Sequence, residues 1–310
     1  MSTPQRRITG ERRPDLRKDA VGSDLLLLLT AAIWGFAFVA QRAGMDHIGP
    51  FLFNGIRFAL GCCVLLPVIL AGRRRGTSHD GVRLLRDGAL AGTVLFAGAS
   101  LQQLGLVYTT AGNAGFVTGL YVVLVPVLGT ILGQRTGLRT WIGSALAAGG
   151  MLVLSAAGTR RMAAGDLIVL CGSVFWALHI LLISRLMRRY GAIQLAAVQF
   201  GACSILSLAA AAVLEKPSPE GVVGALVPLL YGGLVSVGIA YTLQVVAQKR
   251  ADPSHAAIIM SLETVFALVG GWIVLGERIT LQGAAGGVLM MSAMLVSASA
   301  GRRRLVPEGL

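Results

Sequence analysis

The four-residue sequence LGQR at residues 132–135 returns 143 positions later as LGER at residues 275–278. Five apolar segments accompany each copy, so the sequence indicates two repeats of one five-segment unit. A unit that crosses a bilayer five times leaves its copy facing the opposite way, because five is an odd number. Inverted repeats of this kind are typical of secondary transporters, whose substrate site lies between the two halves near the membrane midplane.

The composition is that of a membrane protein. Only 13% of the residues are charged and 55% are apolar, whereas about 25% are charged in an average soluble domain. Apolar stretches of about 20 residues, long enough to cross a bilayer as a helix, recur along the chain. We therefore predict an all-helical polytopic membrane protein with ten transmembrane helices, arranged as two inverted five-helix repeats. The predicted spans are residues 25–43, 51–70, 89–107, 112–132, 141–157, 167–183, 192–214, 222–247, 256–275 and 281–300.

The basic residues predict the orientation of these spans. The net charge is +13, but the arginines and lysines lie mostly in the tails and in short loops, so we expect no nucleic-acid partner. With ten spans, 21 of the 27 basic residues fall on the side of the two termini. The positive-inside rule places that side in the cytoplasm. Arg160 and Arg161 are the exception, because they fall on the outside.

This topology divides the chain into four parts. We expect a cytoplasmic basic tail at residues 1–23, a first repeat at 24–158, a second, inverted repeat at 159–300 and a cytoplasmic tail at 301–310. We expect the chain to lie in the plasma membrane, which in a bacterium is the inner membrane. Asp24 and Asp166 each stand ten residues before a tryptophan, Trp34 and Trp176. Each aspartate falls at the expected start of a helix, where capping of free backbone N–H groups is its simplest role.

Five motifs spread over residues 24–300 carry a family resemblance. They are Trp34-Gly35, the stretch from Pro50 to Phe58, the run from Asn113 to Pro126, Ser261-Leu262-Glu263, and LGER at residues 275–278. The chain resembles the EamA-type family of the drug/metabolite transporter superfamily. The resemblance implies two inverted five-helix repeats and the movement of small metabolites, often outward. Two positions depart from the family pattern, because Thr264 stands where proline is usual and Gln134 where glutamate is usual.

Arg57 and Glu263 are the two charged residues that stand far from the ends of the predicted spans. A charge at the centre of a membrane helix costs about 2.5–3.5 kcal/mol on insertion scales, so both require an explanation. A rise of about 1.5 Å per residue places their depths about 10 Å apart, so a direct salt bridge requires tilted helices or an extended arginine.

Each charge has a functional and a structural interpretation. Arg57 is a candidate counter-charge for a substrate carboxylate or phosphate; alternatively it snorkels to the outer surface or caps a carbonyl. Glu263 is the candidate for proton coupling, because a carboxyl group removed from water holds a proton more readily. Alternatively it is a buried structural acid.

Further polar and aromatic residues at similar depths are candidates for a substrate-binding cavity. Together with Arg57 they are Trp34, Asn54, Gln102, Tyr121, Trp176, His179, Gln199, Tyr241 and Gln244. Packing and helix-to-helix hydrogen bonds explain them at least as well as ligand contacts do. Asn54 and Arg57 share a helix face because they are three residues apart. Across the repeat Arg57 aligns with Gln199, so the expected site is not symmetric.

Several other classes of function are excluded or disfavoured. An ATP-driven pump is excluded, because no lysine follows a glycine and the sequence therefore has no Gly-Lys phosphate loop. A membrane-embedded enzyme is disfavoured, because the sequence has neither an HExxH motif nor a close histidine pair. We expect no catalytic residue, no cofactor and no metal. A channel is disfavoured because inverted halves suit alternating access better.

The sequence thus predicts a secondary transporter whose partners are a small-molecule substrate and the lipid bilayer, and the family resemblance implies that it works as an exporter. A membrane-embedded binding or sensor protein without flux is the alternative. Homo-oligomerisation stays open. Amino acids and their derivatives, sugars, nucleosides and amphiphilic drugs all fit a cavity that mixes aromatic rings, amides and one charge of each sign.

Overall fold

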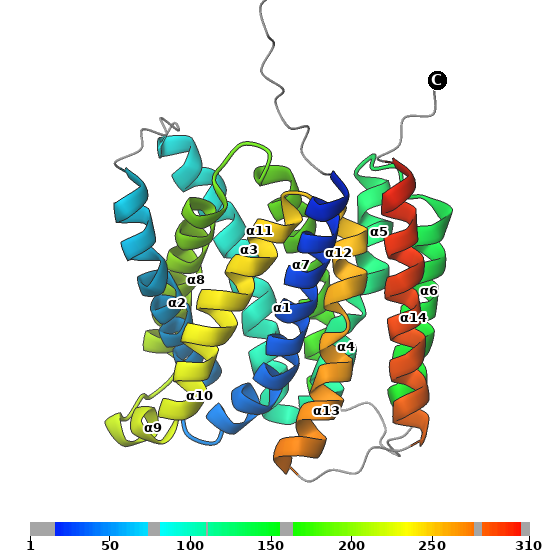
Figure 1. Ribbon diagram of the computed structural model, residues 1–310. Coiled ribbons are helices and arrows are strands. Elements are labelled where there is room, and N and C mark those ends of the chain that lie inside the picture. The colour runs from blue at the N-terminus through cyan, green and yellow to red at the C-terminus, as the bar shows by residue number, and fades with distance from the viewer. Residues whose placement is uncertain (1–15, 74–80, 110, 156–163, 276–280, 305–310) are drawn as a thin grey trace, which may run out of the picture.

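The computed structural model describes residues 16–73, 81–109, 111–155, 164–275 and 281–304, and every regular element in these ranges is a helix. Most of the predicted tail at 1–23, the pair Arg160 and Arg161, and residues 276–278 of the second LGER copy lie outside them. The helices form a bundle in which the start of α1 (Leu16–Gly44) and the end of α14 (Leu281–Arg304) lie at the same end (Figure 1).

In the first half of the chain, each predicted span corresponds to one helix, except that the fourth span is broken in two. After α1 come α2 (Pro50–Arg73), α3 (Gly81–Tyr108), α4 (Ala111–Gly119), α5 (Tyr121–Ile131) and α6 (Leu138–Ser155). The break falls at Leu120, whose backbone N–H bonds to the carbonyl of Val117 at 3.2 Å. This bond spans three residues and is therefore tighter than the α-helical pattern.

The second half repeats this order with two irregular spans. Its helices are α7 (Ala164–Leu186), α8 (Ala192–Leu214), α9 (Pro219–Gly224), α10 (Leu226–Leu230), η1 (Tyr231–Tyr241), α11 (Thr242–Gln248), α12 (Pro253–Met260), α13 (Glu263–Leu275) and α14. The segment η1 is a π-helix, a form that often marks functional sites. The break between α12 and α13 includes Leu262, which lies 142 positions after Leu120. Both halves are therefore interrupted at the same place, and broken membrane helices are a common setting for binding sites.

Length, composition and exposure show that the bundle belongs in a membrane. Eight helical segments are long and apolar enough to cross a bilayer, and two further apolar helices, Leu138–Val153 and Ala284–Ser297, are shorter. Large apolar side chains lie on the surface, among them Ile205 with 69% and Trp272 with 54% of the side chain exposed. Such a surface is unfavourable in water but suits lipid tails. The chain is a multi-pass membrane protein.

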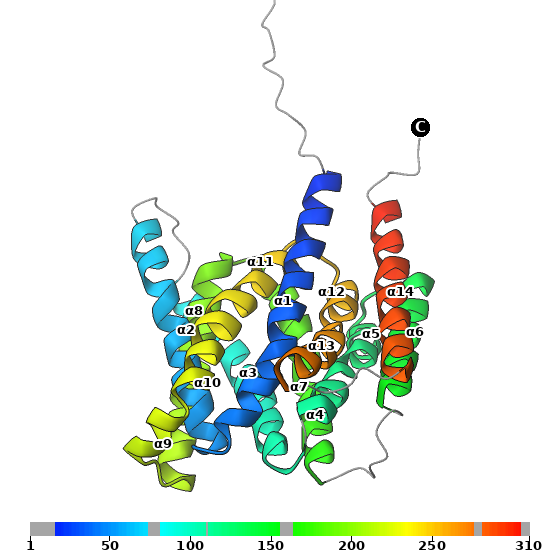
Figure 2. The same ribbon diagram turned by 60° about the horizontal axis from the view of Figure 1, so that its bottom comes forward.

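Glycines allow pairs of helices from the two halves to approach closely. α3 packs against α7, and α6 lies beside α14 in both views (Figures 1 and 2). A Cβ atom on Gly105 would lie 2.8 Å from the carbonyl oxygen of Gly165, and one on Gly150 would lie 2.7 Å from that of Gly286. These separations leave no room for a side chain, so both helix pairs require glycine at the contact.

The capping role expected for Asp24 is wrong, because this residue does not lie at a helix start. α1 begins at Leu16, about two turns before Asp24, because the charged residues that precede the apolar stretch are good helix formers. The carboxylate of Asp24 instead lies 2.8 Å from Nε2 of His255. Asp166 does lie in the first turn of α7, but its side chain accepts a hydrogen bond from the hydroxyl of Thr109. Both aspartates therefore connect helices.

Candidate functional site

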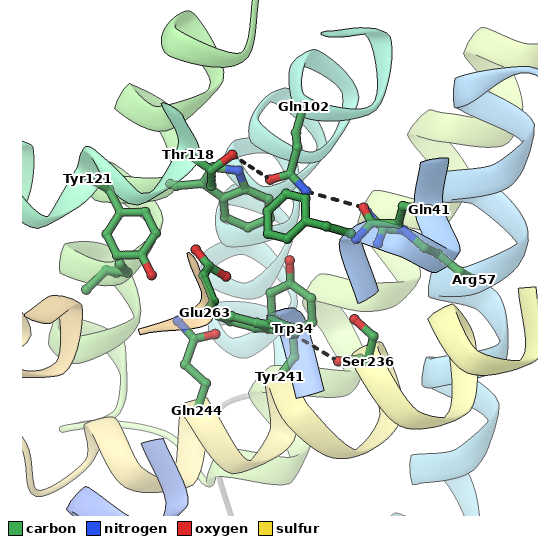
Figure 3. A pocket seen from close by; sticks show the side chains of 13 residues that line it. Trp34, Gln41, Arg57, Gln102, Thr118, Tyr121, Ser236, Tyr241, Gln244 and Glu263 are labelled. Carbon is green, nitrogen blue, oxygen red and sulfur yellow. Dashed lines mark hydrogen bonds between the residues drawn. The ribbon is translucent and has the colours of Figure 1, made fainter. Parts of the chain in front are cut away.

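A cavity lies inside the bundle, between residues of both halves of the chain (Figure 3). Helices α1 to α5 and α7, η1, α11 and α13 contribute to it. The lining residues are Trp34, Phe38, Gln41, Arg57, Gln102, Thr118, Tyr121, Trp176, Ile180, Ser236, Tyr241, Gln244 and Glu263.

Arg57 is a buried cation at one side of this cavity. Its side chain is 1% exposed, which excludes snorkelling to the outer surface. Nε donates a hydrogen bond of 2.9 Å to Oδ1 of Asn54, one helical turn earlier on α2. The guanidinium carbon lies 4.9 Å from the ring centre of Phe58, within the range of a cation–π contact. Asn54 and Phe58 therefore hold the guanidinium in place.

The guanidinium retains unused donor capacity. In the part of the chain that the structure describes, no carboxylate forms an ion pair with Arg57, and its buried Nη2 has no hydrogen-bond partner. A buried charge without a counter-charge is unfavourable, so this arginine is poised to bind an anionic group.

Glu263 provides the opposite charge. It is the first residue of α13 and is 3% exposed, and it follows directly on the break in the ninth predicted span. The start of a helix favours a negative group because the backbone N–H dipoles point toward it. The hydroxyl of Tyr121 points toward the carboxyl group (Figure 3). Within the described ranges, Oε1 of Glu263 has no hydrogen-bond partner.

An aromatic cluster centred on Tyr241 forms one wall. The ring centre of Tyr241 lies 4.5 Å from that of Trp34, 6.0 Å from that of Trp176 and 5.9 Å from that of Phe58. Nε1 of Trp34 donates a hydrogen bond of 3.3 Å to the carbonyl of Ser236 in η1, which fixes the indole against that helix. The wall therefore joins α1, α2, α7 and η1.

A chain of hydroxyl and amide groups crosses the cavity on another side. The hydroxyl of Thr118 lies 3.4 Å from Oε1 of Gln102, and Nε2 of Gln102 donates to Oε1 of Gln41 at 3.3 Å (Figure 3). Gln41 is anchored in turn by a bond from its Nε2 to the carbonyl of Ala37. These bonds give the cavity fixed polar groups as well as charges.

The cavity brings together most of the residues that the sequence singled out. Eight of them line it: Trp34, Arg57, Gln102, Tyr121, Trp176, Tyr241, Gln244 and Glu263. Asn54 lies behind the lining and orients Arg57. Nε2 of His179 and Oε1 of Gln199 lie 2.8 Å apart and are fully buried, so these two residues contact each other rather than line the cavity.

Five lining residues escaped the sequence analysis: Phe38, Gln41, Thr118, Ile180 and Ser236. Thr118 lies three residues before Tyr121, so helical spacing offered a signal. The same spacing applies to Phe38 and Gln41, four and seven residues after Trp34, and to Ile180, four residues after Trp176. Ser236 offered no signal, because serines occur throughout these spans. Among the residues described, no group of three or more His, Cys, Asp or Glu residues is arranged to hold a metal ion.

The fold and the site together define a class of protein. It is a multi-pass helical membrane protein with a buried cavity between two similar halves, and the cavity carries one positive and one negative side chain. The profile of the EamA-like transporter family matches residues 22–156 and 163–299, one match in each half. The chain belongs to this family, and the resemblance inferred from its motifs is confirmed.

Individual relatives agree with this assignment. A protein of Archaeoglobus fulgidus described as an uncharacterized transporter is 34% identical over 88% of this chain and 85% of its own length. A protein of Escherichia coli K12 described as the uncharacterized inner membrane transporter YedA is 26% identical over 86% of this chain and 87% of its own length. A solved structure aligns with a TM-score of 0.75 over 92% of this chain and 99% of its own, at 21% identity, and supports the fold alone.

Proposed function

We propose that this protein is a secondary transporter that moves a small metabolite or drug-like solute across the plasma membrane by alternating access, as an exporter. The observation that carries the proposal is the cavity. It lies deep in the bundle and is lined by residues of both halves. Several polar atoms of its described lining residues have no hydrogen-bond partner. A structural core would pair or exclude such groups. The relatives named as transporters support the same class.

The proposed topology has ten crossings in two inverted repeats, at residues 24–158 and 159–300, with both termini in the cytoplasm. Three observations support it. The start of α1 and the end of α14 lie at the same end of the bundle (Figure 1). The breaks at Leu120 and Leu262 are 142 positions apart. The eight long spans and two shorter apolar helices together equal the ten predicted crossings.

Alternating access requires a closure at each end of the cavity, and two side-chain pairs are placed for this role. Asp24 contacts His255 near the start of α1. Asp166 contacts Thr109, which follows the end of α3. α3 meets the far part of α1 through the Gln102–Gln41 bond, and Gln41 lies 17 residues, or about 25 Å, beyond Asp24 along the helix. The two pairs are thus at opposite ends.

Glu263 is the proposed proton-coupling group. It is the buried acid of the cavity and is contributed by a broken helix, where a change in helix geometry alters its surroundings. Transport by Glu263→Gln should lose the pH dependence that wild type shows, because the amide cannot exchange a proton. The matched control is Glu220→Gln, which changes an exposed acid in α9. A Glu263→Gln protein with the rate and pH profile of wild type would refute the coupling role.

Counterflow in liposomes tests the function itself. Purified protein is screened for solutes that raise its melting temperature, and the hits are then measured for exchange across proteoliposomes loaded with the same solute. A transporter exchanges labelled solute on both sides faster than protein-free liposomes do. Binding without exchange, under imposed pH gradients of both signs, would instead indicate the alternative, a binding or sensor protein.

A further inference from the structure

Two opposite charges share one cavity, yet neither neutralises the other. Arg57 comes from α2 and Glu263 from α13, and both line the same space. They lie on different sides of it (Figure 3). Among the described residues no ion pair joins them, and each retains a buried polar atom without a partner, Nη2 and Oε1 respectively. A ligand that reaches both would supply the missing partners.

The groups around Arg57 select an anionic ligand group of particular shape. Nε is already used by Asn54, and the ring of Phe58 covers the guanidinium carbon. Nη2 remains available for an acceptor. A planar guanidinium pairs best with a carboxylate or phosphate, because its N–H groups point in fixed directions. Gln41 and Gln102, which line the cavity with it, are neutral, so Arg57 is the single cation of the described lining, and one positive charge suits a singly charged carboxylate.

The groups around Glu263 select a ligand that donates hydrogen bonds. Oε1 of Glu263 and Oε1 of Gln244 are both buried acceptors that find no partner within the described part of the chain. An ammonium group has several N–H donors and no acceptor, so it complements this pair of oxygens. The aromatic faces of Trp34 and Tyr241 line the same cavity and also attract cations.

From this arrangement we infer that the cavity takes a small zwitterion, with its carboxylate at Arg57 and its ammonium group at Glu263. The inference rests on the proposed function and adds the substrate class to it. A ligand with zero net charge and two separated charges would satisfy both buried groups at once. A solute with one charge would leave the opposite residue desolvated and unpaired, which is unfavourable.

Matched solutes that differ by one charge test this inference. Three series, built on glycine, leucine and phenylalanine, each contain the amino acid, its carboxyl amide and the acid that lacks the amino group. We expect a zwitterion of at least one series to raise the melting temperature of the purified protein, and its two singly charged analogues to require about tenfold higher concentration. Equal effects of an analogue and its zwitterion, or no effect of any zwitterion, would overturn the inference.

Two variants test which residue binds each charged group of the ligand. Arg57→Gln should abolish the preference for the amino acid over its carboxyl amide. Glu263→Gln should abolish the preference for the amino acid over the acid that lacks the amino group. Each comparison is made between two ligands of the same folded variant. A general loss of stability would weaken the binding of both ligands and would therefore not change the preference. Arg57→Lys retains the charge and should restore part of the first preference. Arg188→Gln and Glu220→Gln, which change exposed residues, should leave both preferences intact. Unchanged preferences in both cavity variants would refute the assignment.

Counterflow separates this inference from the proposed function. If zwitterions bind but are not exchanged across proteoliposomes, the transporter proposal fails while the binding assignment stands. If a solute of another class binds and is exchanged, and zwitterions are not, the substrate class is wrong while the transporter proposal stands.

Discussion

Nε2 of His255 lies 2.8 Å from Oδ1 of Asp24, and this contact joins α1 of the first half to α12 of the second. Nδ1 of the same ring lies 2.8 Å from the hydroxyl of Ser297 in α14, so one imidazole connects three helices. The repeat-related aspartate, Asp166, contacts Thr109 of the other half at the opposite end. In both halves, the acid near the start of the first helix therefore reaches across to the other half.

Loss of the first contact should loosen one end of the bundle. Asp24→Ala removes a hydrogen bond worth about 1–2 kcal/mol, so the amides of residues 256–260 should exchange with deuterium about tenfold faster. Asp166→Ala is the matched control, and it should act on the ends of α3 and α7 instead. The same exchange pattern in both variants would show that the two contacts do not close separate ends.

Contact between α1 and α13 should depend on a single glycine. A Cβ atom on Gly35 would lie 2.4 Å from Cβ of Phe266 and 2.7 Å from the carbonyl oxygen of Glu263. Gly35→Ala should therefore destabilise the protein by about 1–3 kcal/mol, which thermal unfolding in detergent would report. Gly149→Ala is the control, because a Cβ there meets nothing within 4 Å, and it should stabilise by about 0.5–1 kcal/mol. Equal melting temperatures of the two variants would contradict this packing.

Asn54 should decide whether Arg57 is available to a ligand. Asn54→Asp places an anion beside Nε and gives the buried cation a partner, so the melting temperature should hold or rise. The same change should weaken zwitterion binding about tenfold, because the guanidinium is already neutralised. Asn54→Ala is the comparison, and it should lower stability by about 1.5–3 kcal/mol through the loss of the Nε acceptor. Undiminished binding by Asn54→Asp would indicate that Arg57 does not contact the ligand.

Tyr241 should stabilise the aromatic wall through its ring. Tyr241→Phe keeps the contacts to Trp34, Trp176 and Phe58 and should change the free energy of unfolding by less than about 1.5 kcal/mol. Tyr241→Ala removes the ring and should cost about 3–5 kcal/mol. Thermal unfolding of both variants measures the difference, and a similar loss in each would instead assign the stability to the hydroxyl.

The membrane class, the places of the apolar segments and the twofold repeat could be read from the sequence, because a bilayer imposes its demands locally. Each crossing must be apolar over about 20 residues and must satisfy its own backbone groups as a helix. Buried charges are also visible in sequence, since an arginine and a glutamate inside apolar spans are rare. Arg57 and Glu263 could therefore be singled out without knowledge of their surroundings.

The tertiary structure decided which of these residues share a space. Arg57 and Gln199 are equivalent in the repeat, yet only Arg57 lines the cavity, while Gln199 pairs with His179. Ser236 lines it too, although nothing in its local sequence distinguishes it. The rotation of each helix about its axis, set by contacts such as Gly105 with Gly165, determines which side chains point inward. These contacts join residues far apart in the chain, and for this reason the local pattern of apolar and polar residues cannot specify them.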